Sequence, residues 1–286
     1  MTAREPPAEQ VARIARRAVE EDLGQGDLTC DALALGPARA RGRLSFQEEG
    51  VLCGLPAARE AMRAVDPDTA FRATASDGDA IGAGQGVAEV EGLASSLLSA
   101  ERVMLNFLQR LSGIATMTAA YVAACAGTGA RVLDTRKTTP GLRVLERYAV
   151  RAGGGHNHRF NLADGILIKD THLAAAGGVA GALLRARASA GPLQKVGVEV
   201  QSLEELAAAI AGGADHVLLD NFAIELLGEA ARRRAAGITT EASGGIGLGS
   251  VTAVARSGVD FISVGALTHS ARAIAIHMDL EALGNP

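Results

Sequence analysis

The sequence predicts an α/β fold in which a small antiparallel domain precedes an incomplete β/α barrel. The chain has 286 residues, of which 48% are apolar and 21% are charged, so it can bury a sizeable core and has the composition of a globular protein. Short extended pieces separated by glycine-rich turns occupy much of its first third. From Arg131 a short apolar strand and a helical segment alternate repeatedly, which is typical of a parallel sheet.

The N-terminal third begins with an amphipathic helix. Four residues recur there at helical spacing: Val11, Ile14, Ala18 and Leu23. Between Arg41 and Val90 the sequence changes to the pieces RLSFQ, VLCGL, AFRATAS and GVAEVEG, which favour a small antiparallel sheet with a helix or two. A long helical run then spans residues 93–127, and we expect Gly113 to break it between the two domains.

Six barrel strands are expected in the rest of the chain. They are RVLDT (131–135), GILIK (165–169), VGVEV (196–200), HVLLD (216–220), TTEAS (239–243) and FISVG (261–265). Several are separated by 20 to 30 residues, about the length of one strand-plus-helix unit. Ser202 and Glu205 form the S-x-x-E pattern of a capping box, as expected where a loop becomes a helix. Six such units predict an incomplete relative of the eight-stranded barrel.

Chemically active side chains stand at the carboxyl ends of these strands, where the reactive groups of such barrels gather. They are Arg136 and Lys137 after the first strand, Lys169, Glu199 and Asp220 at the next three, Ser243, Gly244 and Gly245 after the fifth, and Gly265 at the sixth. The glycine turns offer backbone N–H groups to an anion, and two carboxylates beside a phosphate are typical of Mg²⁺. The strand ends therefore predict a ligand with phosphate and diphosphate groups bridged by magnesium.

A second anionic ligand is indicated by the remaining cations. Residues 131–159 contain seven Lys or Arg and only two acidic residues, although the whole chain has a net charge of −4. His158 and Arg159 follow the glycines at 153–155, which we expect to be flexible, and the fork of an arginine can grip a carboxylate with two hydrogen bonds. Because a dense cluster of buried cations is costly without counterions, it indicates an anion in the cleft.

Composition argues against several other classes of partner. Aromatic residues make up 3% of the chain, so few side chains are available to stack on nucleic-acid bases. The polar start MTAREPPAEQ is unlike a signal peptide, and no apolar run is long enough for a membrane span. Cys30, Cys53 and Cys125 form no metal-type pair. We expect a cytoplasmic protein that binds neither nucleic acid nor membrane.

Other interpretations of the same residues stay open at this point. Lys169 at a strand end could form the Schiff base of a lyase, and the basic segment could belong to a polyanion-binding module. Glycine pairs are often plain turns, and each carboxylate could serve in a salt bridge. For Arg143, Arg147 and Arg151 a solvated helix stripe is the favoured interpretation. Four histidines have no metal-ligand spacing and are left unassigned: His172, His216, His269 and His277.

A set of motifs narrows these choices. It comprises DTRKTTPGLR (134–143), YAVRAGGGHNHR (148–159), LIKDTH, VEV, LLDN, EASGGI and SVGAL, with EEDLGQGDLT and SAERVMLNFLQRLSGIAT upstream. Together they resemble the quinolinate phosphoribosyltransferases, also called carboxylating nicotinate-nucleotide pyrophosphorylases. The resemblance covers nearly the whole chain, and the first two motifs are far more specific than a glycine-rich loop.

The resemblance implies a fold and an assembly. It implies an N-terminal α/β sandwich, residues 1–112, joined by a C-terminal helix at 270–286, and an open barrel of six to seven strands, residues 113–269. It also implies a homodimer, or a higher oligomer built from it, in which Arg102 completes the partner's active site.

The resemblance further implies a reaction of quinolinate and phosphoribosyl pyrophosphate that yields nicotinate mononucleotide, diphosphate and CO₂ in NAD biosynthesis. The implied quinolinate residues are Arg102, Arg136, His158, Arg159 and Lys169. Those implied for phosphoribosyl pyrophosphate and Mg²⁺ are Thr135, Lys137, Glu199, Asp220, Ser243, Gly244, Gly245, Val264, Gly265 and Ala266. Within these sets, Lys137, Lys169, Glu199 and Asp220 are the expected catalytic residues, and Glu199 and Asp220 the expected metal ligands.

Two positions depart from the family pattern. Thr171 stands where the family commonly has Asn, and Asn161 where it often has Gly. Neither replaces a charged group, so we expect them to tune a loop without abolishing activity. A related branch associated with molybdenum-transport operons shares the fold and many motifs but uses another substrate. The intact TRKTTPGLR and HNHR favour the quinolinate enzyme.

Overall fold

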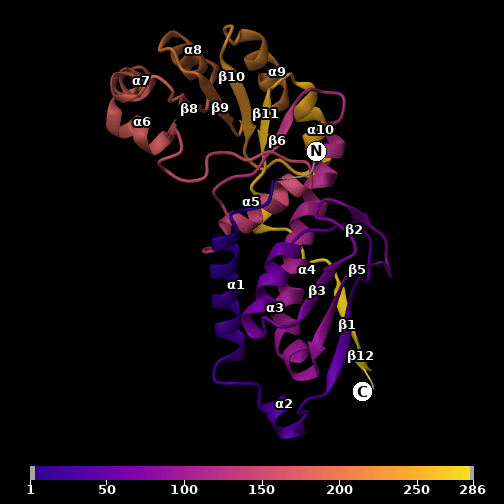
Figure 1. Cartoon of the computed structure of the whole chain (residues 1–286). Helices are drawn as coiled ribbons and strands as arrows, with labels where there is room; N and C mark the ends of the chain where they lie inside the picture. The colour runs from indigo at the N-terminus through magenta and orange to yellow at the C-terminus, as the bar shows by residue number, and fades with distance from the viewer. Residues whose placement is uncertain (1–3, 284–286) are drawn as a thin grey trace. The chain divides into compact units, whose positions relative to one another are not determined.

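The computed structural model describes residues 4–283, which form two compact units (Figure 1). The first unit contains the described residues up to 119, residues 138–154 and those from 268 onward. The second contains residues 120–137 and 155–267. The segment 138–154 thus groups with the first unit, although we expected it within the barrel domain.

The first unit is built on an antiparallel sheet with the strand order β12-β1-β5-β3. These strands are β1 (Arg39–Phe46), β3 (Ala70–Ala73), β5 (Gly86–Leu93) and β12 (Ile276–Leu283), and a separate pair is formed by β2 (Gly50–Val51) and β4 (Ala80–Ile81). The helices are α1 (Ala8–Leu23), α2 (Leu28–Leu33), α3 (Leu55–Val65), α4 (Ala94–Ala124) and α5 (Arg143–Ala152). Helices α1, α3 and α4 lie on one side of the sheet (Figure 1), which gives the expected α/β sandwich.

The expected C-terminal helix at 270–286 is wrong in the described part of the chain. Residues 276–283 form β12, which pairs antiparallel with β1 along its whole length. Ile276 and Met278 are buried, while His277 between them and Asp279 after them are exposed, the alternation of a strand with one covered face. A free edge of β1 would leave a row of unpaired backbone groups, and pairing with β12 satisfies them.

Gly113 does not break the long helix as expected. Helix α4 runs without interruption through this position. A Cβ atom on Gly113 would lie 1.9 Å from the carbonyl oxygen of Arg272. The glycine therefore permits a close approach of two backbones and does not end the helix. The piece VLCGL is also only partly extended, because Val51 lies in β2 while Leu55 already begins α3.

The second unit is the expected open barrel, with six parallel strands in the order β6-β11-β10-β9-β8-β7. They are β6 (Arg131–Leu133), β7 (Ile166–Ile168), β8 (Val196–Val200), β9 (His216–Asp220), β10 (Thr239–Ser243) and β11 (Phe261–Ser263), and all six fall within the segments that the sequence predicts. The helices are α6 (Asp170–Ala176), α7 (Gly178–Ser189), α8 (Leu203–Ala211), α9 (Ile224–Arg233), α10 (Leu248–Arg256) and α11 (Ala266–His269).

The sheet order places β6 and β7 at its two edges, so the barrel is open between them. All five residues of β8 are buried, as expected of a strand covered on both faces. Ser202 caps α8 by accepting a hydrogen bond from the backbone N–H of Glu205 at 3.2 Å. Among the helices described, none is both long and apolar enough to cross a membrane.

Candidate active site

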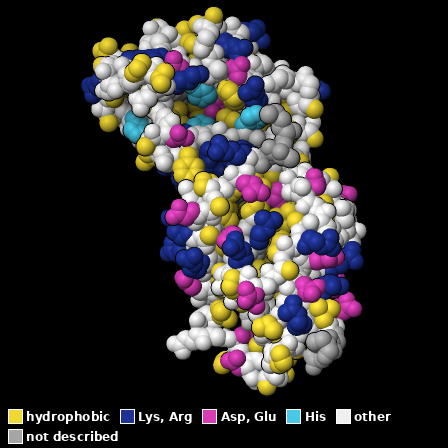
Figure 2. Space-filling view, in the orientation of Figure 1, with side chains coloured by type: hydrophobic (Ala, Val, Ile, Leu, Met, Phe, Trp, Pro, Cys, Tyr) yellow, Lys and Arg dark blue, Asp and Glu magenta, His cyan; other side chains and the backbone are white. Residues whose placement is uncertain are grey.

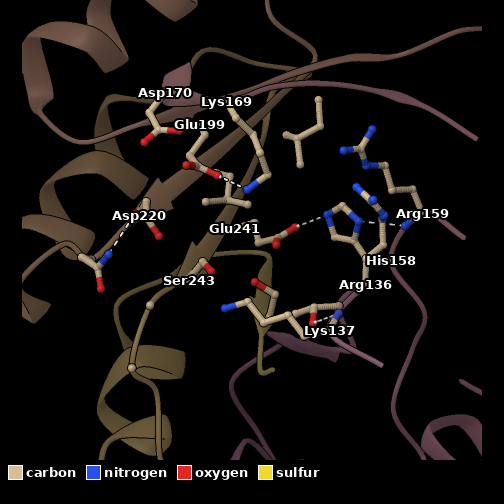
Figure 3. Close-up of a pocket in the computed structure, with 17 residues that line it drawn as sticks. Arg136, Lys137, His158, Arg159, Lys169, Asp170, Glu199, Asp220, Glu241 and Ser243 are labelled. Atoms are coloured by element: carbon tan, nitrogen blue, oxygen red, sulfur yellow. Dashed lines mark hydrogen bonds and ion pairs between the residues drawn. The ribbon is translucent and has the colours of Figure 1, made fainter. Parts of the chain in front are cut away.

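A cavity of about 720 Å³ opens at the carboxyl ends of the barrel strands. Figure 2 shows the corresponding hollow in the second unit, with histidine and Lys or Arg side chains around it, and Figure 3 shows its lining. Eleven of the expected site residues line it: Thr135, Arg136, Lys137, His158, Arg159, Lys169, Glu199, Asp220, Ser243, Gly244 and Gly245. The structure therefore brings together residues that are up to 110 positions apart in the chain.

A buried carboxylate fixes the segment that leads to His158 and Arg159. Asp134, at the end of β6, is fully buried and accepts hydrogen bonds from Asn157 Nδ2 at 2.6 Å and from the backbone N–H of His158 at 2.7 Å. His156 also forms a parallel bridge with Leu133. The segment 156–158 therefore runs along the open edge of β6, and it carries Arg159 toward the side of the barrel where Arg136 lies.

Gly153, expected to be flexible, is tightly packed. A Cβ atom at this position would lie 2.3 Å from the carbonyl oxygen of Ala115. The residue is buried, whereas Gly154 is exposed and has a φ of +86°. At Gly153 the glycine is thus explained by packing, and at Gly154 by the left-handed conformation.

Two arginines face the cavity close to each other. The pKa of the Arg159 guanidinium is lowered, first by its burial and then by the positive charge of Arg136. Arg159 Nη1 donates to the carbonyl oxygen of Gly165 at 2.9 Å, which holds the guanidinium in the gap of the open barrel. Two like charges held close together favour the binding of an anion, because a carboxylate between them offsets their repulsion.

Lys169, which follows β7, forms an ion pair with Glu199 within the cavity. Its Nζ donates to Glu199 Oε2 at 2.8 Å, while its backbone N–H donates to His172 Nδ1 at 2.9 Å. Since a Schiff base requires an amine that is free to attack, this ion pair counts against the lyase interpretation. His172, which had no assignment, acts as part of the N-terminal cap of α6.

Asp220 and the glycine turn after β10 form one packed unit. Asn221 Nδ2 donates to Asp220 Oδ2 at 2.8 Å, and the Asn221 backbone N–H donates to the carbonyl oxygen of Ser243 at 2.9 Å. A Cβ atom on Gly244 would lie 2.2 Å from Asn221 Oδ1. Gly244 and Gly245 both have positive φ, at +100° and +59°. Successive residues in such conformations can present their N–H groups to a phosphate.

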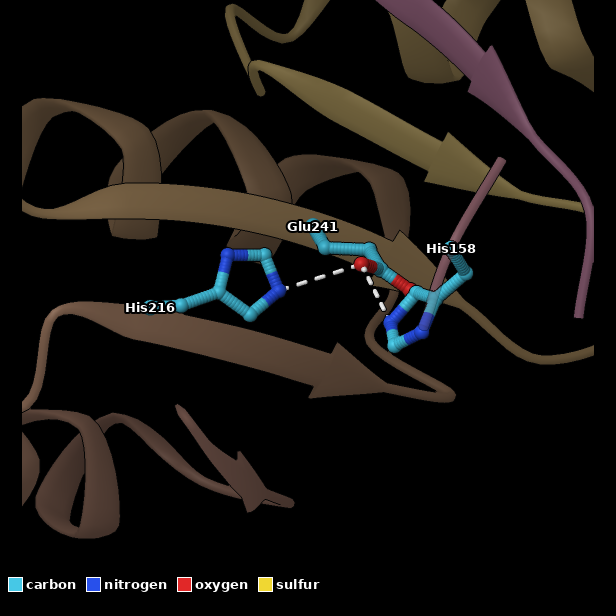
Figure 4. A group of neighbouring side chains, drawn as sticks. All are labelled: His158, His216 and Glu241. Carbon is cyan, nitrogen blue, oxygen red and sulfur yellow. Dashed lines mark hydrogen bonds and ion pairs between the residues drawn. The ribbon is translucent and has the colours of Figure 1, made fainter. Parts of the chain in front are cut away.

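A buried carboxylate was missed in the sequence. Glu241 on β10 is 1% exposed, and its Oε2 lies 3.0 Å from His216 Nε2 and 3.3 Å from His158 Nε2 (Figure 4). Burial raises the pKa of Glu241, but the hydrogen bonds from the two histidines outweigh burial and lower it to about 2. Strand periodicity could have found this residue, because Glu241 stands two positions before Ser243 and so faces the same side of the sheet.

The remaining predicted residues are not among those that line the cavity. Arg102 is exposed on α4 in the first unit, and Val264 is buried after β11, next to Gly265 and Ala266. The two residues that depart from the family pattern, Asn161 and Thr171, are exposed. Asn161 Oδ1 accepts a hydrogen bond from the backbone N–H of Ala163 at 2.9 Å.

The solvated stripe expected on α5 is wrong for Arg147, which is 8% exposed. Helix α5 lies within the first unit, where its buried face also includes Glu146 and Tyr148. Arg143 is half-buried, and its Nε donates to Thr138 Oγ1 at 2.9 Å. This hydrogen bond ties Arg143 to its own segment, as expected of the structural role favoured from the sequence.

Comparisons with known proteins point to one family over nearly the whole chain. The family model described as quinolinate phosphoribosyl transferase, N-terminal domain, matches residues 27–112, and that of the C-terminal domain matches residues 114–279. A probable nicotinate-nucleotide pyrophosphorylase (carboxylating) of Bacillus subtilis is 44% identical over 271 residues, covering 95% of this chain and 93% of the relative. A nicotinate-nucleotide pyrophosphorylase (carboxylating) of Mycobacterium leprae is 44% identical over 271 residues, covering 93% and 95%. The solved nicotinate-nucleotide pyrophosphorylase of Francisella tularensis has a TM-score of 0.93 at 38% identity and covers 98% of this chain and 99% of its own.

Proposed function

The chain belongs to the quinolinate phosphoribosyltransferase family, and from this premise we propose how its barrel cavity performs the family's reaction. The enzyme transfers the phosphoribosyl group of phosphoribosyl pyrophosphate to quinolinate, and it releases diphosphate and CO₂ to leave nicotinate mononucleotide. We base this proposal on one observation: a cation cluster, the carboxylates of Glu199 and Asp220 and a glycine turn line the same cavity.

The lining of the cavity divides into two parts that suit the two substrates. Arg136 and Arg159 bind the two carboxylates of quinolinate, with His158 and Lys169 beside them. Lys137, Thr135 and the turn Ser243–Gly245 bind the phosphate and diphosphate groups. Both substrates are anions, so this division accounts for part of the positive charge in residues 131–159, namely Arg136, Lys137 and Arg159.

The reaction needs positioning more than a protein nucleophile. The pyridine nitrogen of quinolinate attacks the anomeric carbon while the bond to the diphosphate oxygen breaks. Lys137 stabilises the negative charge that develops on the leaving diphosphate. The alkylated ring nitrogen is positively charged, so the ring can accept the electron pair of the adjacent carbon–carboxylate bond as CO₂ leaves. A proton then replaces the lost carboxylate on that ring carbon.

Glu199 and Asp220 fit a magnesium site. They stand at the ends of the neighbouring strands β8 and β9, both line the cavity, and carboxylate oxygens are the ligands that Mg²⁺ prefers. Mg²⁺ usually takes few protein ligands together with substrate oxygens, which an open cavity permits. When bound, the ion would neutralise charge on the diphosphate group. Lys169 holds one oxygen of Glu199 and so orients this carboxylate.

Removal of divalent metal is expected to abolish product formation. With EDTA, the diphosphate charge would be balanced by Lys137 and backbone N–H groups alone. We expect formation of nicotinate mononucleotide to stop and to return when excess Mg²⁺ is added, as measured by chromatography. Full activity in EDTA, after removal of metal from the substrate solutions as well, would contradict the role of Glu199 and Asp220 as metal ligands.

We propose that the active enzyme is a homodimer in which Arg102 reaches the quinolinate site of the partner. Arg102 is exposed on α4 of the first unit, while the described residues that line the cavity all belong to the second unit. An exposed arginine is therefore available to a cavity on another subunit. Quinolinate carries two carboxylates, and a third arginine would add a further charge-assisted hydrogen bond.

Mixing two inactive variants is expected to restore activity. An Arg102→Ala chain lacks the group that it supplies to its partner, and a Lys137→Ala chain lacks a group of its own cavity. A dimer of one chain of each type then contains one intact site, so a random mixture should reach about a quarter of wild-type activity. Subunit exchange is first verified with differently tagged chains. No recovery after verified exchange would contradict the shared site.

The substrate test decides the proposed function. Purified protein is supplied with phosphoribosyl pyrophosphate, Mg²⁺ and either quinolinate or nicotinate. The proposal expects nicotinate mononucleotide and CO₂ from quinolinate and no turnover of nicotinate. Product from nicotinate alone would overturn it, whereas turnover of neither base would favour a substrate of the molybdenum-operon branch. Trapping of a carbonyl substrate on Lys169 by borohydride would instead support the lyase.

We place the enzyme in the cytoplasm. All three cysteines are buried free thiols, which a reducing compartment preserves.

A further inference from the structure

A line of hydrogen bonds crosses the barrel beneath the quinolinate end of the cavity. It begins at His216, at the start of β9, passes through Glu241 on β10, and reaches His158 in the segment beside β6 (Figure 4). From there it continues to the backbone N–H of Arg159, which donates to His158 Nδ1 at 2.8 Å. Four residues from three separate parts of the chain are thus connected.

The hydrogen bond from Arg159 determines which nitrogen of His158 carries a proton. Because His158 Nδ1 accepts this bond, the neutral ring bears its hydrogen on Nε2, the atom that faces Glu241. Both ring nitrogens are therefore engaged within the protein. In this arrangement His158 supports Arg159 and presents the rest of its ring to the cavity, whereas a role as hydrogen-bond donor to quinolinate would require it to leave Glu241.

The line also separates two cavities. A second cavity of about 390 Å³ lies toward the amino ends of the strands and is lined by His216 and Thr239, among others. His158, Arg159, Leu167 and Glu241 line both this cavity and the larger one. The hydrogen-bonded residues therefore form part of the wall between the two cavities. A shift of His158 or Glu241 would change the position of Arg159.

A buried carboxylate in this position is costly unless it has a function or full hydrogen bonding. Glu241 Oε2 accepts hydrogen bonds from both histidines, whereas Oε1 accepts none from the described residues. An apolar side chain would fill the same space between strands at lower cost. His216 is fixed in turn, since its Nδ1 lies 2.9 Å from Thr239 Oγ1. His216 thus fixes Glu241 by one hydrogen bond, and Glu241 fixes His158 by another.

We propose that Glu241, held by His216, is a positioning residue for quinolinate: it orients His158 and through it the backbone that carries Arg159. This inference rests on the proposed function, because it assigns Arg159 to a quinolinate carboxylate. It assigns Glu241 and His216 no contact with either substrate. Their removal should therefore weaken quinolinate binding selectively, while the phosphoribosyl pyrophosphate end of the cavity stays as it is.

Two substitutions of Glu241 separate its charge from its hydrogen bonding. Glu241→Met removes both acceptor oxygens at similar volume, and Glu241→Gln keeps one oxygen that can still accept from the histidines. We expect KM for quinolinate to rise about tenfold or more in Glu241→Met, the effect of losing one charge-assisted hydrogen bond. Glu241→Gln should lie between it and wild type. KM for phosphoribosyl pyrophosphate should stay within about twofold in both.

His216→Phe tests the outer part of the line. It should raise KM for quinolinate less than Glu241→Met does, and it should add little in a Glu241→Met background, because His216 acts through Glu241. Additive effects of the two substitutions would contradict the line as a connected unit.

Thr240→Val is the matched control. Thr240 is a buried residue on the same strand, and its Oγ1 donates to Asp260 Oδ2 at 3.0 Å, so the variant also loses a buried hydrogen bond. It should leave KM for quinolinate unchanged. A rise in both KM values, shared by Thr240→Val, would indicate general loosening of β10 and overturn the inference, as would an unchanged KM in an active Glu241→Met enzyme. If wild type itself turns over no quinolinate, the proposed function fails instead.

Discussion

Replacement of Lys137 by Ala is expected to lower kcat by about a hundred- to a thousandfold, the cost of removing one group that stabilises developing charge. Lys137 follows β6, lines the cavity and has an exposed side chain, so it can reach the diphosphate of phosphoribosyl pyrophosphate. The charge of the diphosphate grows as its bond to the anomeric carbon breaks. A residue that acts on this charge affects the transition state more than the bound substrate, so KM for quinolinate should change little.

Steady-state kinetics with each substrate varied in turn check this expectation. Arg143→Ala is the matched control, because Arg143 belongs to the same segment DTRKTTPGLR but bonds to Thr138 and does not line the cavity. It should keep activity within about twofold of wild type, as a substitution away from the site usually does. A Lys137→Ala enzyme with a raised KM for quinolinate and an unchanged kcat would place Lys137 at the other end of the cavity.

The sequence predicted the barrel because its strands are signalled locally. Each strand is a short apolar run followed by a helical pattern, and the parallel order then brings the ends of these strands to one edge. Lys169, Glu199 and Asp220 could therefore be placed in one cavity without knowledge of any contact. The N-terminal helix was likewise found from its 3.6-residue period, although its buried residues are Val11, Ala15 and Val19.

Features that depend on distant partners could not be predicted in this way. The segment 276–283 is a strand because the free edge of β1 accepts it, and no short-range pattern reveals that edge. Gly113 resembles a helix break until the backbone of Arg272 is seen against it. Strand periodicity gives the side of the sheet that Glu241 faces, but not its pairing with His158 and His216, which reach it from separate elements.

Glu146→Ala is expected to lower the free energy of unfolding by about 3–5 kcal/mol, the cost of leaving the other charge of a buried ion pair without its partner. Glu146 on α5 is fully buried and accepts hydrogen bonds from Arg110 Nη2 at 2.8 Å and Nε at 3.2 Å. It also accepts from the backbone N–H of Thr139 at 3.0 Å and from Thr139 Oγ1 at 2.7 Å. Removal of this one carboxylate would break four hydrogen bonds, and Arg110 would keep only its bonds to the carbonyl oxygens of Ala271 and Thr268.

Urea unfolding monitored by circular dichroism measures this effect, with Glu91→Ala as the matched control. Glu91 also pairs with an arginine, Arg41, at 2.8 Å, but both side chains are exposed to solvent, so water replaces the lost contact. The control should unfold like wild type. If Glu146→Ala also unfolds like wild type, the pair with Arg110 contributes no more than a surface ion pair. A double variant lacking both Arg110 and Glu146 should be less destabilised than Glu146→Ala, because it retains no uncompensated charge.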